Sequence, residues 1–315
     1  MGTKATNGGL YLKIGQAIAM QSAVLPPEFQ KMFARMFDDA PQNSWQDVER
    51  VIREDFAGKS PEEVFGVSFT NKPGSGVIET KARASASVAQ VHWARLADGR
   101  EVAVKVQKRE IASQVGWDLW AFNDESIHIL VRPSFIQSGA LHYRTLNVRN
   151  GLLAGEPRLN GRVYIPKVYR DLSSKRVMTT EWIEGVRLWD KEALTAPCGE
   201  WRGRHGKGGL GLSLKQVMTT MVDLFSAQMF LWGVVHCDPH PGNIFIRRQP
   251  NGQPELVLID HGLYVYMTPE FRHQYCQFWK AIMTFDNASL NKITSAWGVK
   301  APDLFALLGI SQFGR

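Results

Sequence analysis

The sequence predicts an α+β fold with a helical N-terminal extension, and three observations support it. Apolar residues recur at helical spacing between residues 10 and 39. Two strand-like runs, 87–96 and 101–107, flank an Asp-Gly pair, which predicts a β-hairpin. The apolar stretch 214–233 contains several polar residues and ends at a glycine, so it predicts a buried helix rather than a membrane span.

The first 70 residues are expected to be helical. Ser44 stands before an apolar pattern, with Asp47 three positions later, which predicts a helix start in which Asp replaces the Glu of a capping box. Ser60 is followed by a proline and two glutamates, which predicts a second capped helix. These signals place a helical extension over residues 1–70, ahead of the strand-rich part of the chain.

Strand and helix patterns continue through the rest of the chain. Strand patterns occupy residues 162–169 and 176–183, and a second hairpin is predicted around Asn251-Gly252. A helical pattern then covers residues 268–306. Its candidate core residues are three aromatic side chains, Trp279, Phe285 and Trp297.

Composition limits the class of protein and of ligand. The chain has 315 residues, of which 44% are hydrophobic and 21% charged, as is typical of a soluble globular protein. The net charge of +7 fits a polyanionic ligand such as a nucleotide, an anionic membrane surface or a mitochondrial location. Because the basic residues are scattered, we expect no nucleic-acid partner. We expect neither a membrane-spanning helix nor a signal peptide, because no apolar run is long enough for either.

The cysteines do not indicate a disulfide framework or a zinc site. The chain has three of them, widely spaced, at Cys198, Cys237 and Cys276. With no C-x-x-C pair, a reducing compartment is expected. Zinc ligation by His236 and His240 is not expected either, because Pro239 and Pro241 break the helix on which two such histidines would share a face.

Four residues in a fixed order indicate a nucleotide phosphate site. Asp238 is followed by Asn243, and Asp260 stands shortly before a glycine. Lys105 ends a VAVK strand pattern upstream of all three. Enzymes related to protein kinases use this order around a nucleotide phosphate and its magnesium ion. Taken alone, Lys105 would be interpreted as an edge-strand surface lysine, but the order of all four residues favours the phosphate site.

Each of these residue types suits one task in phosphoryl transfer. A nucleotide such as ATP or ADP is strongly negative, so we expect Mg²⁺ held by the oxygen atoms of Asn243 and Asp260. Asp238 is the candidate base that accepts a hydroxyl proton or orients a water molecule. Lys105 supplies a cation for the α- and β-phosphates.

The loop that covers the phosphates is expected just before the lysine strand. Kinases have a glycine-rich turn here, whereas this chain has alanines and serines. The residues expected to bind the nucleotide in this loop are Ala84, Ser85, Ala86, Ser87 and Val88. Because alanine does not adopt positive φ freely, we expect a stiffer cover and an altered phosphate position.

Together these motifs resemble the UbiB family, the aarF-domain atypical kinases linked to coenzyme Q and mitochondrial lipid homeostasis. Residues 13–16 resemble the K-x-G-Q signature of the family, and residues 84–92 resemble its alanine-rich loop. Residues 102–105 supply the lysine strand, and residues 236–243 resemble the H-x-D-P-H-P-G-N motif. Residues 260–262, Asp-His-Gly, stand in place of D-F-G. The opening of the chain is most similar to the fungal and animal mitochondrial branch.

The resemblance implies a bilobal protein-kinase-like fold. Its parts would be the helical extension, a partly degenerate N-lobe over residues 71–185 and a truncated C-lobe over residues 186–315. Lys13 would lie over the active site as a catalytic residue, and Gln16 would lie beside it in contact with the nucleotide. The implied activity is ATP hydrolysis or small-molecule phosphorylation in the mitochondrion. A lipid or quinone-precursor ligand and a membrane surface are the further partners that the resemblance implies.

The segment after the lysine strand departs from the family pattern. No E-x-D element, whose Glu pairs with the lysine, occurs between residues 106 and 160, so we interpret this segment as shortened or replaced. Glu125 has kinase-like spacing from Lys105 but dissimilar surroundings. Two hypotheses therefore stay open: an active ATP-dependent enzyme, and a catalytically impaired pseudokinase or scaffold that only binds nucleotide. The motif around Lys13 argues against a third, an aminoglycoside-kinase type of phosphotransferase.

Overall fold

The computed structural model describes residues 42–70, 74–85, 88–109, 151–198, 209–237, 241–261 and 264–298. The chain forms two compact units. The first consists of Met1–Thr220 with Asp238–Leu263, and the second of Met221–Cys237 with Tyr264–Arg315. Both contain helices and strands, which confirms the predicted α+β class.

Two short helices precede the first sheet, α3 (Trp45–Asp55) and α4 (Pro61–Phe65). The Ser44 side chain accepts a hydrogen bond from the backbone N–H of Asp47, which confirms the first predicted helix start. Ser60 and Glu63 cap each other reciprocally at the second, where Pro61 occupies the first turn. The helical pattern between residues 10 and 39 lies outside the described residues.

A five-stranded antiparallel sheet follows in the first unit. Its strands are β1 (Val77–Ile78), β2 (Ala84–Ser85), β3 (Ala89–Arg95), β4 (Glu101–Gln107) and β6 (Val177–Glu181). Their order is β1-β3-β4-β6, with β2 also paired to β3. The β3–β4 turn contains Gly99 at φ +87°, which confirms the hairpin predicted from its Asp-Gly pair.

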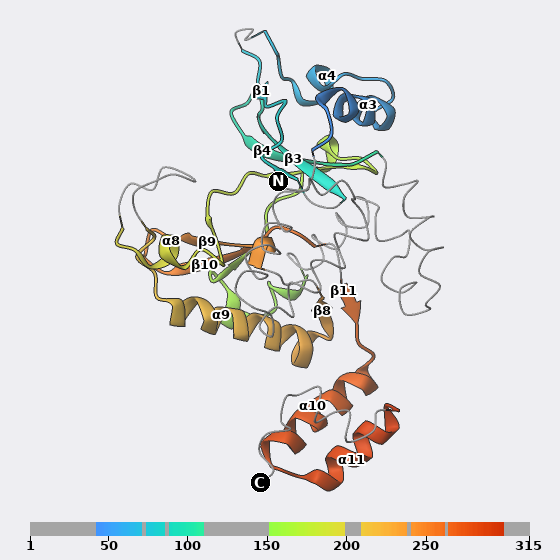
Figure 1. Ribbon diagram of the computed structural model, residues 1–315, viewed down its shortest axis with the longest axis vertical. Coiled ribbons are helices and arrows are strands. Elements are labelled where there is room, and N and C mark those ends of the chain that lie inside the picture. Colours follow the sequence, from blue (N-terminus) through green and yellow to red (C-terminus); the bar gives the residue numbers. More distant parts are fainter. Residues whose placement is uncertain are drawn as a thin grey trace, which may run out of the picture. The chain divides into compact units, whose positions relative to one another are not determined.

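Helix α3 covers one face of this sheet (Figure 1). The side chains of a strand alternate between faces, so every second residue of β4 belongs to the same face. Val102, Val104 and Val106 are buried there, and they share an apolar core with Val51 and Ile52 of α3. The opposite face of β4 is consequently the one that carries its polar residues.

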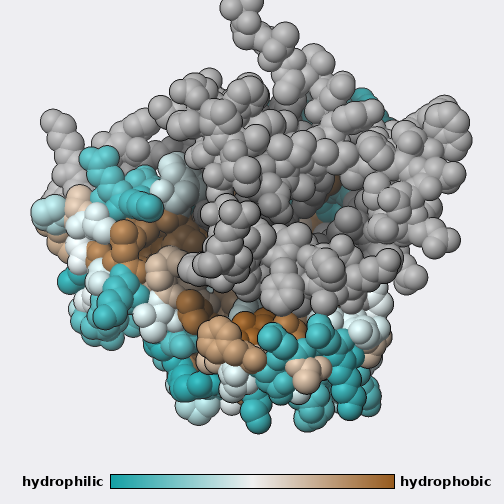
Figure 2. Space-filling view, turned by 60° about the horizontal axis from the view of Figure 1, so that its bottom comes forward, coloured by the Kyte–Doolittle hydropathy of each residue, from teal (hydrophilic) through white to brown (hydrophobic). Residues whose placement is uncertain are grey.

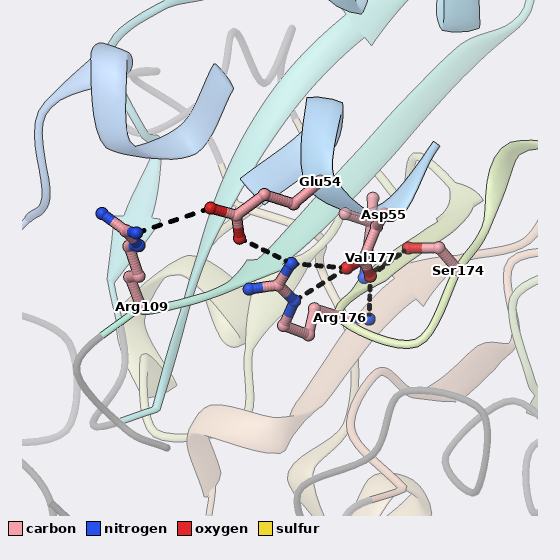
Figure 3. Close-up of polar contacts among 6 residues, drawn as sticks. All are labelled: Glu54, Asp55, Arg109, Ser174, Arg176 and Val177. Carbon is pink, nitrogen blue, oxygen red and sulfur yellow. Dashed lines mark hydrogen bonds and ion pairs between the residues drawn. The ribbon is translucent and has the colours of Figure 1, made fainter. Parts of the chain in front are cut away.

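A charged network fixes the end of α3 to the sheet (Figure 3). Asp55 accepts hydrogen bonds from Ser174 Oγ at 2.8 Å, from the backbone N–H of Arg176 at 2.7 Å and from Arg176 Nε at 2.8 Å. Glu54 accepts from Arg176 Nη2 at 2.9 Å and lies 3.5 Å from Arg109 Nη2. We call Glu54, Asp55, Arg109, Ser174 and Arg176 the Asp55 network. Because Arg176 directly precedes β6 and Arg109 follows β4, the network joins α3 to the ends of two strands.

A second, four-stranded sheet also belongs to the first unit. Its strands are β5 (Val163–Tyr164), β7 (Val186–Arg187), β9 (Ile244–Arg248) and β10 (Pro254–Leu258), in the order β5-β10-β9-β7. The β9–β10 hairpin turns at Gly252, φ +81°, as predicted. Strand β5 pairs in parallel with β10, so the two strand patterns at 162–169 and 176–183 belong to different sheets.

Short helical segments accompany these sheets. They are the 3-10 turns η5 (Pro157–Leu159), η6 (Arg170–Leu172) and η9 (Pro241–Asn243) and the helix α8 (Lys191–Thr195). Helix α9 (Leu214–Ser226) continues into a π-helical turn, η8 (Ala227–Trp232), and ends at Gly233 with φ +66°, which confirms the predicted helix end.

The second unit contains a two-stranded sheet and a pair of helices. Strand β8 (Val234–His236) pairs antiparallel with β11 (Tyr264–Tyr266). Helices α10 (Pro269–Met283) and α11 (Asn287–Ala296) enclose a small apolar cluster, and Trp297 packs against it as predicted. Among the described residues, no helix has the length and apolar character needed to cross a membrane.

The prediction that three aromatic residues near the end of the chain lie in the core is wrong for two of them. Trp279 is 36% exposed and Phe285 is 88% exposed. Phe285 follows the end of α10 at φ +55°, so its position belongs to a turn rather than to the packed face of the helix.

Figure 2 shows apolar surface interspersed with hydrophilic surface on one side of the molecule.

Candidate functional site

Lys105 lies in the centre of the five-stranded sheet. Strand β4 is hydrogen-bonded to β3 on one side and to β6 on the other, and Lys105 pairs with Val91 and Met178. This excludes the alternative that Lys105 is an edge-strand surface lysine. Because it alternates with Val104 and Val106, its side chain belongs to the face opposite α3.

The structure brings Lys105 and Asp260 together, although they lie 155 positions apart in the sequence. Lys105 Nζ donates a hydrogen bond to Asp260 Oδ2 at 2.7 Å, and the two side chains are 20% and 29% exposed. Asp260 stands two residues after β10, whose five residues are all buried. The strand therefore fixes the start of the segment from which the carboxylate reaches the lysine.

Asn243 stands at the same end of the β9–β10 hairpin as Asp260. It occupies the last position of η9, directly before β9, and is 8% exposed. The first residue of β9, Ile244, pairs with the last residue of β10, Leu258. The backbone N–H of Ile259 also donates to the Asn243 carbonyl at 3.1 Å. The antiparallel pairing thus makes the two predicted magnesium ligands neighbours.

The chemistry of these three residues fits a magnesium-bound phosphate. Carboxylate and amide oxygens are hard ligands, which Mg²⁺ prefers, and an ammonium group suits a phosphate oxygen. Asp260 and Asn243 provide the oxygen ligands, and Lys105 provides the ammonium group. Mg²⁺ usually takes only one or two protein carboxylates and completes its shell with water and phosphate oxygens.

Arg187 supports this site and was missed in the sequence analysis. Its Nη1 donates to the Gly242 carbonyl at 2.5 Å, and its guanidinium lies 5.0 Å from the centre of the Phe245 ring. Strand β7, which carries Arg187, pairs with β9. The arginine therefore ties η9, and with it Asn243, to the second sheet. No motif in the sequence singles out an arginine at this position.

The expected phosphate cover is described on both sides of residues 86 and 87. Ala84 and Ser85 form β2 and pair with Val91 and Gln90 of β3, and Ser85 is 3% exposed. Val88 directly precedes β3, and its carbonyl accepts a hydrogen bond from the backbone N–H of Lys108 at 2.9 Å. Ala86 and Ser87, between them, lie outside the described residues.

Three further candidates and the kinase-like glutamate lie outside the described residues. They are Lys13, Gln16, Asp238 and Glu125. The strand that leads toward Asp238 is β8, which ends at His236. Gln228 of the π-helical turn η8 binds the end of this strand, because the backbone N–H of His236 donates a hydrogen bond to Gln228 Oε1 at 2.8 Å. Gln228 is 1% exposed, and the sequence analysis missed this role because its helical pattern shows only that the position faces inward.

Comparisons with known proteins show which proteins this chain is similar to. A model of the ABC1 atypical kinase-like domain matches residues 35–129 and 153–294. The ABC1 family protein lscO of Purpureocillium lilacinum is 50% identical, over 95% of this chain and 54% of that protein. The AarF domain-containing protein kinase 1 of Xenopus tropicalis is 33% identical, over 98% of this chain and 57% of that protein. The chain therefore spans about half the length of these curated relatives.

A solved structure shares the fold. It is the complex of Rv3197 with erythromycin from Mycobacterium tuberculosis, with a TM-score of 0.59 and 23% sequence identity. The match covers 94% of this chain and 73% of that one. At this identity the likeness concerns the fold alone.

Proposed function

Because the chain belongs to the ABC1 atypical kinase-like family, we propose that it binds ATP or ADP with Mg²⁺ at Lys105, Asn243 and Asp260. The observation that carries the proposal is the 2.7 Å contact between Lys105 and Asp260, which converge from distant parts of the chain. A phosphate site of this kind needs a cation and an acid in contact range. The neighbouring position of Asn243 supplies a second oxygen donor.

In the proposed site, each residue takes the role that its chemistry suits. Magnesium supplies charge neutralisation and holds the phosphates in a fixed geometry when it is bound. Asp260 and Asn243 would hold the ion, and Lys105 would bind the α- and β-phosphates. In the structure described here, Lys105 neutralises Asp260, so the lysine also keeps that carboxylate compensated before a ligand arrives.

The proposed reaction is transfer of the terminal phosphoryl group to water or to a small molecule. Asp238 would accept the proton of the attacking hydroxyl or water. Residues 84–88 would cover the phosphates, and Lys13 and Gln16 would lie over the site. Following the family resemblance, we also propose a mitochondrial location, a lipid or quinone-precursor acceptor and contact with a membrane surface.

Nucleotide binding without turnover is the second candidate. It is favoured by the identity of the partner of Lys105 in the described part of the chain, which is Asp260 rather than a glutamate. Kinases hold the lysine with a glutamate when the site is active. A phosphate-release assay on protein that has been shown to bind ATP separates the candidates, because the scaffold would release no phosphate above the rate of an Asp238→Asn variant.

A thermal-shift titration with ATP and Mg²⁺ tests the binding proposal. At 100 times the Kd, a ligand stabilises the folded protein by about 2.7 kcal/mol, which raises the Tm by roughly 5 °C for a domain of this size. Asp260→Asn should abolish the magnesium-dependent part of the rise, and Lys105→Met should reduce the rise with or without the metal.

Asp98→Asn is the matched control for these variants. It removes a carboxylate from the β3–β4 turn, far along the strand from Lys105, and Asn-Gly suits that turn as well as Asp-Gly. Its Tm rise should equal that of the wild type. A full magnesium-dependent rise in Asp260→Asn would reject the metal role.

A further inference from the structure

Two polar residues of β3 are buried within the five-stranded sheet. Gln90 is 2% exposed and His92 is 0% exposed. They pair with Val106 and Val104 of β4, so they belong to the face that α3 covers, opposite the face of Lys105. Burying a polar group is costly unless its hydrogen bonds are satisfied, so the partners of these residues indicate what they hold.

Gln90 binds the backbone of Asn43, which lies 47 positions earlier in the sequence. Its Oε1 accepts from the Asn43 N–H at 2.8 Å, and its Nε2 donates to the Asn43 carbonyl at 3.4 Å. The same Nε2 lies 3.0 Å from His92 Nε2, while His92 Nδ1 lies 2.9 Å from the Glu79 carbonyl. Because a carbonyl only accepts, His92 Nδ1 carries the proton and Nε2 accepts from Gln90. We call Asn43, Glu79, Gln90 and His92 the Gln90 clamp.

The neighbours of Asn43 are attached to the same hairpin. Gln42 Nε2 donates to the Ala82 carbonyl at 3.1 Å. The Trp45 ring meets the His92 ring edge-on, with the ring centres 5.3 Å apart. Gln42, Asn43 and Trp45 therefore each contact a residue between 79 and 92.

This hairpin also carries the expected phosphate cover. Ser85, a residue of the cover, pairs with Gln90 between β2 and β3. The backbone of Gln90 thus bounds the cover, while its side chain holds Asn43 on the α3 side of the sheet. A displacement of residues 42–45 would therefore act directly on the Ser85–Gln90 pair.

We propose that Gln90 and His92 are positioning residues that couple residues 42–45 to the phosphate cover. In this arrangement residues 42–45 position the Ser85–Gln90 pair, and nucleotide bound beside that pair stabilises the attachment of residues 42–45 in return. The β2–β3 pair is the rigid element that both sides share. The coupling to nucleotide rests on the proposed function, whereas the mechanical link between segment and cover does not.

The mechanical link is tested without nucleotide by hydrogen–deuterium exchange, which reports local opening. Gln90→Met keeps the volume of the side chain and removes its hydrogen bonds. Exchange should accelerate both at residues 42–45 and at residues 84–89. Asp55→Ala is the matched control, because it loosens α3 at its other end and should leave residues 84–89 unchanged. Acceleration at 42–45 alone in Gln90→Met would overturn the proposal.

The coupling to nucleotide is tested with ADP and Mg²⁺ on the same proteins. Coupled sites typically change affinity by 5-fold or more, so Gln90→Met should raise the Kd for MgADP by at least about 5-fold, and Asp55→Ala by less than about 2-fold. Equal changes in the two variants would reduce Gln90 to a structural residue. If the wild type binds no MgADP, the proposed function fails, and the exchange experiment still decides the mechanical link.

A milder variant protects both tests against misfolding. Gln42 is exposed, and Gln42→Ala removes only the hydrogen bond to Ala82. It should change exchange at residues 84–89 and the Kd for MgADP in the same direction as Gln90→Met, by smaller amounts. No change in either measurement would count against the coupling.

Discussion

The two ends of α3 are attached to the same sheet by opposite chemistry. The Asp55 network, at the end of the helix, is charged, and the side chains of Glu54 and Arg109 in it are 38% and 47% exposed. The Gln90 clamp, just before the helix, consists of the buried side chains of Gln90 and His92 and the backbone groups of Asn43 and Glu79 that they bind. Exposed ion pairs are screened by salt, whereas a buried histidine responds to protonation. The Asp55 network therefore fixes one end of α3, whereas the Gln90 clamp links the other end of α3 to the β2–β3 pair of the phosphate cover.

Removing Asp55 should have the largest effect on stability. Asp55→Ala leaves the Ser174 hydroxyl and two donors of Arg176 without their acceptor, and the Arg176 side chain is only 27% exposed. We expect the free energy of unfolding to fall by about 2–3 kcal/mol, below the value for a fully buried pair because the network is partly exposed. Urea unfolding measures the change.

The control for Asp55→Ala is Asp98→Ala, which breaks an exposed ion pair with Arg100. Exposed pairs contribute little, so this variant should unfold at nearly the same urea concentration as the wild type. Equal losses in the two variants would mean that the Asp55 network is an ordinary surface ion pair.

Acidification should weaken the Gln90 clamp. Burial lowers the pKa of His92 from its ordinary 6.5, although the hydrogen bond to the Glu79 carbonyl opposes the shift. The unfolded chain then binds more protons than the folded one just below pH 6.5, so the contribution of His92 is complete above that pH and is lost as the pH falls toward the folded pKa. One proton accounts for at most about 1.4 kcal/mol per pH unit.

The groups around His92 define the control for this prediction. The nearby titratable side chain is Glu79, which is paired with Arg83, and the other side of the clamp faces Asp47 and Lys108. His92→Asn keeps a donor for the Glu79 carbonyl and cannot be protonated. Its stability, measured by urea unfolding between pH 7.5 and 5, should decline less steeply than that of the wild type. Parallel curves would show that His92 does not titrate in this range.

Salt should produce the smallest effect and should separate the two attachments. Glu54→Gln weakens the contacts with Arg109 and Arg176 at the exposed side of the network. We expect a loss of about 0.5 kcal/mol at low ionic strength that largely disappears in about 0.5 M NaCl. The loss caused by Gln90→Met should be the same at both salt concentrations, because Gln90 is uncharged and binds the Asn43 backbone and the His92 ring. A salt-dependent loss in Gln90→Met would remove the distinction.

Local signals in the sequence predicted much of the fold. The serines before α3 and α4, the glycines of two hairpins and the glycine after α9 each act on their own few residues, and each is found where it was expected. Pairing between distant strands was not predictable in this way, because it depends on which surfaces meet. The parallel pairing of β5 with β10 is an example.

The candidate site was predicted unevenly for the same reason. The order of Lys105, Asn243 and Asp260 in the chain pointed to a common site, and the structure places Lys105 against Asp260. Arg187 and the Gln90 clamp were missed, because their partners are backbone carbonyl and N–H groups that leave no pattern in the sequence. Phe285 was misplaced because helical spacing does not show where a helix ends.

A crystal structure with Mg²⁺ and a non-hydrolysable ATP analogue tests directly whether Lys105 and Asp260 form the nucleotide site. We expect an Asp260 carboxylate oxygen about 2.1 Å from the metal ion. We also expect that Lys105 Nζ leaves Asp260, 2.7 Å away in the structure described here, for a phosphate oxygen. A nucleotide bound elsewhere, with the Lys105–Asp260 pair intact, would contradict this assignment of the nucleotide site.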